Sequence, residues 1–135
     1  VFEEKYGTAK NNLKSQLKSG LDVALDIDWQ GARAVKTQLP NSVSVFILPP
    51  SMDALSDRLV KRGDDATQIA SRMNKARSEI GHFDEYDYLI INDNFEKALI
   101  ELKTIIGASR LETGIQKIRK HSQISELIEG QGRVC

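Results

Sequence analysis

Two carboxylates at the end of an apolar run are the residues of this sequence best placed to do chemistry. Asp26 and Asp28 close the segment 21–28 (LDVALDID), which we predict to be a strand. Side chains alternate along a strand, so both carboxylates point to one side, roughly 7 Å apart. At the carboxyl edge of an α/β sheet they could hold a hydrated Mg²⁺ or accept hydrogen bonds from a base. The alternative is that one of them only caps the following helix.

A second group, of three arginines, has the chemistry to bind phosphates. Arg58 and Arg62 lie one turn apart on a predicted helix, and Arg72 follows on the next helix after a short loop. A planar guanidinium can bind two phosphate oxygens at once. The alternative is that all three are solvent-exposed helix charges, as we expect of Lys61 and Arg77.

The elements that must position these groups alternate between helices and strands. We expect helices at 8–19, 29–38, 51–61, 66–80, 94–109 and 115–128, and strands at 21–28, 42–48 and 87–92. This order predicts an α/β fold with a parallel sheet and helices on both faces. Three strands are few for such a sheet, and the sequence begins at Val1 without a Met. We therefore expect that the first strands are missing.

Composition narrows the class of protein further. The 135 residues carry no formal net charge and are 28% charged, so no overall field attracts nucleic acid. No apolar run is long enough to cross a membrane. A single cysteine, Cys135, excludes an intrachain disulfide and favours the cytoplasm. We expect one domain over residues 1–129 and a flexible tail at 130–135.

Seven segments, in order, resemble the bacterial guanylate kinase family, whose members transfer the γ-phosphoryl group of ATP to GMP. They are YGT at 6–8, LDIDWQG at 25–31, FILPPS at 46–51, RL at 58–59, RG at 62–63, RM at 72–73 and YDYLIIND at 86–93. The resemblance covers residues 1 to about 129. It implies the parallel sheet of a P-loop nucleoside monophosphate kinase, flanked by helices, lacking its N-terminal strands and carrying a helical lid at about 58–77.

The resemblance also implies roles for individual residues. The catalytic residues would be Arg62 and Arg72, which bracket the phosphates from the lid. ATP and its phosphates would be bound by Arg58, Arg62, Asn92 and Asp93, and GMP by Tyr6, Thr8 and Asp28. Asp26 would contact Mg²⁺, brought by ATP, through water. Strand-to-helix turn residues are the alternative for Asn92 and Asp93, and a simple helix cap is the alternative for Thr8.

One family motif has no counterpart in this sequence. The Walker A string G-x-x-x-x-G-K-[ST], which cradles the ATP phosphates, is absent from the 135 residues. We therefore expect this chain to represent the C-terminal two-thirds of a guanylate kinase and to be inactive alone. The alternatives are a non-catalytic guanylate-kinase-like module that binds peptides and a kinase for another nucleoside monophosphate. Homo-oligomerisation stays open, and His82 is most simply structural.

Overall fold

The computed structural model describes residues 12–131, which fall into two units. One unit, 12–26 with 113–131, is helical: it contains a helix at 12–18, α6 (Thr113–Arg119) and α7 (His121–Gln131). The helix at 12–18 buries Leu13. It is followed by Gly20, whose positive φ of 83° suits glycine at a helix end. The other unit, 27–112, carries the sheet and the predicted lid.

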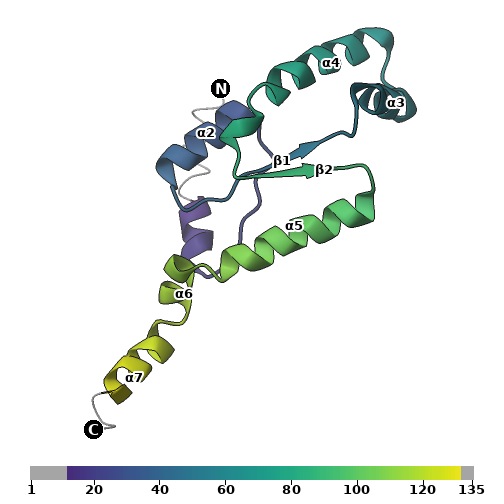
Figure 1. The fold of residues 1–135 in the computed structure, drawn as a ribbon. Coiled ribbons are helices and arrows are strands. Elements are labelled where there is room, and N and C mark those ends of the chain that lie inside the picture. The colour runs from purple at the N-terminus through teal and green to yellow at the C-terminus, as the bar shows by residue number, and fades with distance from the viewer. Residues whose placement is uncertain (1–11, 132–135) are drawn as a thin grey trace. The chain divides into compact units, whose positions relative to one another are not determined.

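A parallel pair of strands organises the larger unit (Figure 1). Strand β1 (Val45–Leu48) pairs with β2 (Tyr88–Ile91) in a register that runs from Val45↔Tyr88 to Leu48↔Ile91. Helix α2 (Trp29–Gln38) precedes β1, and α5 (Phe95–Arg110) follows β2 and contacts it. The long connection between the strands holds α3 (Met52–Arg62), α4 (Ala66–Ile80) and the short helix η1 (Phe83–Glu85).

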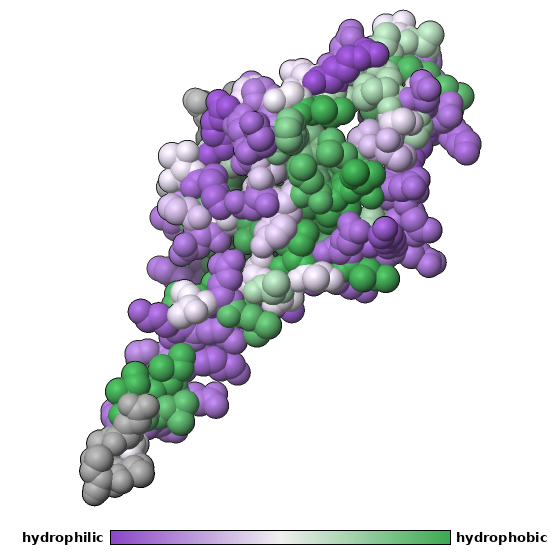
Figure 2. All heavy atoms as spheres, viewed as in Figure 1, coloured by the Kyte–Doolittle hydropathy of each residue, from purple (hydrophilic) through white to green (hydrophobic). Residues whose placement is uncertain are grey.

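The sheet is buried unevenly. Ile90 is only 1% exposed, whereas its neighbours Leu89 and Ile91 are exposed, as alternation along a strand requires. Ile47 on β1 is exposed as well. Figure 2 shows hydrophobic residues gathered near the centre of the view, where Figure 1 draws the strands. The described residues therefore leave part of the sheet's apolar surface uncovered.

Side-chain caps fix where the lid helices begin. The Ser51 hydroxyl accepts from the Ala54 amide at the start of α3. Asp65 and Gln68 form a reciprocal capping box at the start of α4, with distances of 2.8 and 3.0 Å. Such boxes satisfy amides that a helix leaves unpaired at its first turn. The sequence-predicted helices at 29–38 and 66–80 are confirmed at both ends.

The predicted strand at 21–28 is wrong. The structure assigns no strand to this segment, and none of its residues is fully buried. A strand requires a neighbour that pairs with its amides and carbonyls, and in the part of the chain that the structure describes only β1 and β2 pair. Apolar alternation identified a segment suited to a sheet, but alternation cannot supply the pairing.

The single predicted helix at 115–128 is also wrong. The segment forms two helices, α6 and α7, which are separated at Lys120. Several of its apolar side chains are exposed, Ile118 and Leu127 among them, so little packing enforces one continuous helix. Helix α7 continues to Gln131. The rest of the expected tail, 132–135, lies outside the described residues.

Candidate functional site

A tight connection joins the two lid helices. Gly63 ends α3 with a φ of 94°, a left-handed conformation that glycine adopts without strain. Its amide donates to the Val60 carbonyl at 3.0 Å, and the Asp64 amide donates to the Leu59 carbonyl at 3.2 Å. Asp65 then caps α4. The backbone therefore fixes Asp64 between the end of one lid helix and the start of the next.

Two of the predicted phosphate-binding arginines converge on Asp64. The Nε atom of Arg72 lies 3.2 Å from Asp64 Oδ2, and the Nε atom of Arg62 lies 3.9 Å from Oδ1. Asp64 is 10% exposed, whereas Arg62 and Arg72 are 60% and 46% exposed. The structure thus brings these arginines together, as the lid hypothesis requires. Asp64 was not predicted from the sequence, although an acid two residues after Arg62 in a short loop was a usable signal.

The third arginine connects the lid to the sheet. Arg58 Nη2 donates to the backbone carbonyl of Asn92 at 2.8 Å. Asn92 directly follows β2, and its amide donates to the Leu48 carbonyl at 2.7 Å. Asp93 is exposed, and Asn94 caps α5 by accepting from the Lys97 amide. Two of the expected ATP-binding residues, Arg58 and Asn92, are therefore in contact at the carboxyl end of β2.

Asp28 is the cap of α2. Its Oδ1 accepts from the Gly31 amide at 2.8 Å, so Asp28 does cap the following helix. One carboxylate oxygen suffices for a cap, and in residues 12–131 no hydrogen bond involves Oδ2. Asp28 is exposed. Base recognition by its second oxygen thus stays a prediction that is compatible with capping.

Three predicted site residues remain, Asp26, Tyr6 and Thr8. Asp26 belongs to the helical unit and is exposed. Tyr6 and Thr8, the expected contacts to the GMP phosphate and base side, lie outside the described residues. Their roles stay predictions that rest on the resemblance.

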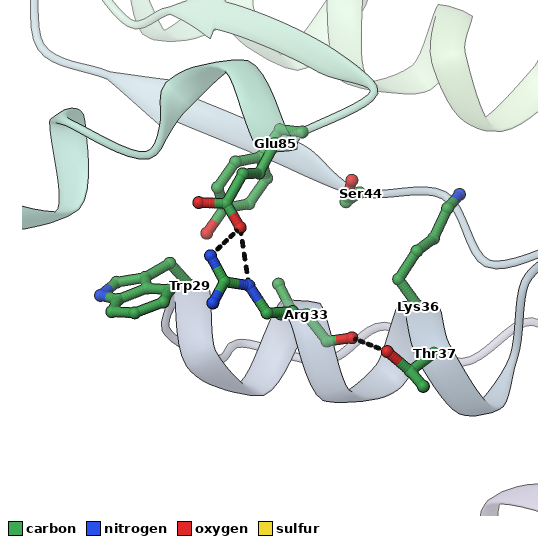
Figure 3. A pocket seen from close by; sticks show the side chains of 8 residues that line it. Trp29, Arg33, Lys36, Thr37, Ser44 and Glu85 are labelled. Carbon is green, nitrogen blue, oxygen red and sulfur yellow. Dashed lines mark hydrogen bonds and ion pairs between the residues drawn. The ribbon is translucent and has the colours of Figure 1, made fainter.

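A cluster that the sequence did not predict joins α2 to η1 (Figure 3). Arg33 donates from Nε and Nη2 to Glu85 Oε1, at 2.8 and 2.6 Å, and its guanidinium lies over the Trp29 ring. The His82 ring stacks on Trp29, with 3.6 Å between centroids, and its Nδ1 is 2.5 Å from Glu85 Oε2. The hydrogen bonds from Arg33 and then from His82 lower the pKa of Glu85. His82 therefore has a structural role here.

A second polar network ties the start of the two strands to α2. Asp87 Oδ2 accepts from the Ser44 amide and from Lys36 Nζ, both at 3.0 Å. Desolvation acts to raise the pKa of Asp87, but the hydrogen bonds from Ser44 and Lys36 outweigh it, and the net shift is downward. Burial, followed by the charges of Glu79, Asp28 and Glu85, raises the pKa of Tyr86.

These networks border a small cavity. Its volume is about 150 Å³, and it is lined by Trp29, Ala32, Arg33, Lys36, Thr37, Ser44, Glu85 and Tyr86. Both of its cations are paired, Arg33 with Glu85 and Lys36 with Asp87. We therefore infer that these residues hold α2 against the strands, and we do not propose that they bind phosphate.

The described residues hold no preformed metal cage. Across residues 12–131 no group of three or more His, Cys, Asp or Glu side chains could hold a metal ion. Mg²⁺ that enters with a nucleotide needs only one or two carboxylates, because waters and phosphates complete its shell. The exposed carboxylate of Asp26 fits such an outer contact. Among the same described residues, no helix is long and apolar enough to cross a membrane.

Comparison with known proteins identifies the family. The family model for guanylate kinase matches residues 1–109. The guanylate kinase of Photobacterium profundum is 49% identical over 132 residues, which are 97% of this chain and 64% of the relative. That of Buchnera aphidicola is 50% identical over 130 residues, 96% of this chain and 63% of the relative. The chain thus spans under two-thirds of the length of these relatives.

A solved structure supports the same assignment. The crystal structure of guanylate kinase from Anaplasma phagocytophilum matches with a TM-score of 0.63 and 33% sequence identity. The match covers 76% of this chain and 48% of that one. The α/β fold with a parallel sheet is therefore confirmed, and the chain belongs to the guanylate kinase family.

Proposed function

We propose that this chain is the lid-bearing and GMP-binding part of a kinase that transfers the γ-phosphoryl group of ATP to GMP, giving GDP and ADP. The observation that carries the proposal is the convergence of Arg62 and Arg72 on one loop between α3 and α4. In residues 12–131 neither guanidinium makes a hydrogen bond, so the N–H donors of both stay available for phosphate oxygens.

In phosphoryl transfer the protein contributes the positioning of the substrates and opposite charge more than covalent chemistry. Donor and acceptor must be held in line, charge on the transferring group must be offset, and water must be kept out. Arg62 and Arg72 on the lid supply the opposite charge, and Arg58 supplies a further guanidinium at the end of β2. Bound with ATP, Mg²⁺ would offset phosphate charge, with Asp26 as its water-mediated contact.

Guanine selectivity is assigned to Asp28. Guanine presents N1–H and N2–H₂ as adjacent donors, and a carboxylate can only accept. Oδ1 of Asp28 is held by the Gly31 amide, which orients the carboxylate. Oδ2 would then accept from the base, while Tyr6 and Thr8 would bind the phosphate and the base side of GMP. ATP and GMP are thus the proposed partners, and the cytoplasm is the proposed location.

We further propose that catalysis needs a P-loop in the same polypeptide. The sequence has no G-x-x-x-x-G-K-[ST] string to hold the ATP phosphates. We use "complete kinase" for a polypeptide in which a P-loop segment precedes this chain. A guanylate kinase whose sequence carries the G-x-x-x-x-G-K-[ST] string is a suitable source of that segment.

A coupled assay of ADP formation tests this function. The complete kinase should turn over with ATP and GMP and should be at least about a hundredfold less efficient with AMP, as hydrogen-bond readout of a base allows. The 135-residue chain alone should show no turnover. Turnover by the chain alone would refute the P-loop requirement, and equal use of AMP would refute guanine selectivity. Absence of GMP-dependent turnover would instead favour the non-catalytic peptide-binding module.

A further inference from the structure

Asp64 carries an unusual combination of burial and bonding. Its side chain is nine-tenths buried, yet Oδ2 has no hydrogen-bond partner in the described residues. A buried carboxylate is costly unless opposite charge lies close to it. In the described part of the chain, that charge comes from Arg62 and Arg72, the residues proposed to act on phosphates.

The backbone holds Asp64 independently of these contacts. Its amide donates to the Leu59 carbonyl, Gly63 before it takes the left-handed conformation, and Asp65 after it caps α4. The backbone of Asp64 is thus fixed in the turn between the lid helices. The side chains of Arg62 and Arg72 are long and exposed.

Two guanidiniums that must act on one phosphoryl group repel each other before substrate arrives. A carboxylate between them offsets this repulsion and restricts both side chains. Each arginine approaches Asp64 through Nε, at 3.2 Å for Arg72 and 3.9 Å for Arg62, without a hydrogen bond. The N–H donors of both arginines therefore stay available to phosphate oxygens, although the carboxylate holds the two side chains close together.

From this geometry we propose that Asp64 is a positioning residue that holds Arg62 and Arg72 together for phosphoryl transfer. The proposal rests on the proposed kinase function. Asp64 itself touches no reacting atom. It acts through the arginines, because it restricts their side-chain conformations and so reduces the conformational entropy that they lose when ATP and GMP bind.

The test is steady-state kinetics of Asp64→Asn in the complete kinase. The amide keeps the size of the side chain and removes its charge. We expect kcat to fall by about tenfold to a hundredfold, the effect of small misplacements of catalytic groups, with KM for both nucleotides within about threefold. Asp64→Glu, which restores the charge on a longer side chain, should recover part of kcat.

Asp65→Asn is the matched control. It removes the same charge one residue along the turn, and asparagine caps a helix about as well as aspartate. Its kcat should stay within about twofold of the parent, because in the described residues Asp65 forms no ion pair with Arg62 or Arg72. Thermal midpoints of both variants show whether each is folded. If Asp64→Asn is unfolded at assay temperature, Asp64→Ser is measured in its place.

A double-mutant comparison separates positioning from simple structural support. In an Arg72→Ala background, Asp64→Asn should lower kcat by less than about threefold, because a residue that acts through Arg72 has lost most of its target. If Asp64→Asn lowers kcat by the same factor in the Arg72→Ala background as in the parent, the proposal is overturned. The proposal is also overturned if Asp64→Asn alone leaves kcat within about threefold of the parent, or if Asp64→Asn and Asp65→Asn lower kcat equally. If the parent kinase itself lacks GMP-dependent turnover, the proposed function has failed, and that outcome is seen before any variant is made.

Discussion

Arg58 on α3 donates its Nη2 hydrogen to the backbone carbonyl of Asn92 at the end of β2, across 2.8 Å. The contact joins the base of the lid to the edge of the sheet where parallel α/β folds bind ligands. It also brings together Arg58 and Asn92, two residues for which the family resemblance implies contacts to ATP. The lid is thereby anchored at one end by Arg58, while Arg62 and Arg72 meet at its far turn.

Removal of Arg58 should weaken ATP binding selectively. In the complete kinase, Arg58→Ala should raise KM for ATP by about tenfold or more, since hydrogen bonds to charged groups are worth about 1.5–3 kcal/mol. KM for GMP should change by less than about threefold. Lys61→Ala, on the same helix and exposed, is the control and should leave both constants unchanged. Equal increases for ATP and GMP would show that the Asn92 contact only supports the fold.

Arg72 should matter most in the transition state. Arg72→Ala should lower kcat far more than it raises KM for either nucleotide, because its guanidinium meets charge that develops during transfer. Arginines with this role contribute about 10³–10⁵-fold to kcat. Arg77→Ala, on the same helix and with a guanidinium that donates to Asn74 Oδ1, is the control. A loss below about threefold for Arg72→Ala would place it among the ordinary surface charges.

Asp28→Asn separates base recognition from capping. Asparagine caps helices as well as aspartate, so the Gly31 contact and the thermal midpoint should survive. Loss of a charge-assisted hydrogen bond to guanine should weaken GMP binding by about tenfold to a hundredfold, with ATP binding nearly unchanged. Calorimetric titration with each nucleotide measures this. Unchanged GMP affinity would leave Asp28 with a capping role alone, and equal losses for both nucleotides would indicate damage to the fold.

Acid should destabilise the fold through Glu85 and Asp87. The pKa of each is lower in the folded protein than its ordinary value, through hydrogen bonds from Arg33 and His82 to Glu85 and from Ser44 and Lys36 to Asp87. A depressed pKa means that the stabilisation is complete above the unfolded pKa and is lost as pH falls through the folded one. The free energy of unfolding should therefore fall with pH from about pH 4.5 downward.

Glu85→Gln tests the source of that acid sensitivity. It should lower the thermal midpoint at pH 7 and make the midpoint less dependent on pH below about 4.5, since one of the titrating pairs is gone. Asp84→Asn, at the neighbouring exposed position of η1, is the control and should preserve the slope. An unaltered slope in Glu85→Gln would show that the Arg33 and His82 contacts do not stabilise the fold.

Local signals predicted the elements of the larger unit well. Helix α2 begins after an Asp cap and ends before Pro40, and its bounds, Trp29–Gln38, were predicted exactly. The strand predicted at 21–28 is absent from the structure, because apolar alternation says nothing about the partner that a strand needs. The family resemblance predicted the lid arginines, whereas their meeting point at Asp64 depends on a turn geometry that only the structure shows.

The contacts of the Trp29 cluster could not be predicted from the sequence, for a different reason. Arg33 and Glu85 are 52 residues apart in sequence, and nothing local to either predicts the other. Their pairing depends on α2 and η1 lying side by side (Figure 3). The same holds for Lys36 and Asp87. Long-range ion pairs of this kind follow from tertiary packing, which periodicity does not encode.

We propose above all that this chain provides the lid and the GMP site of a phosphoryl-transfer enzyme. Phosphorus NMR of the complete kinase with ATP, GMP and Mg²⁺ tests it most directly, because it follows the transferred group itself. We expect the γ-phosphoryl signal of ATP to decline while the β-phosphoryl signals of ADP and GDP grow in equal amounts. Release of the γ-phosphoryl group as inorganic phosphate, or an unchanged spectrum, would contradict it.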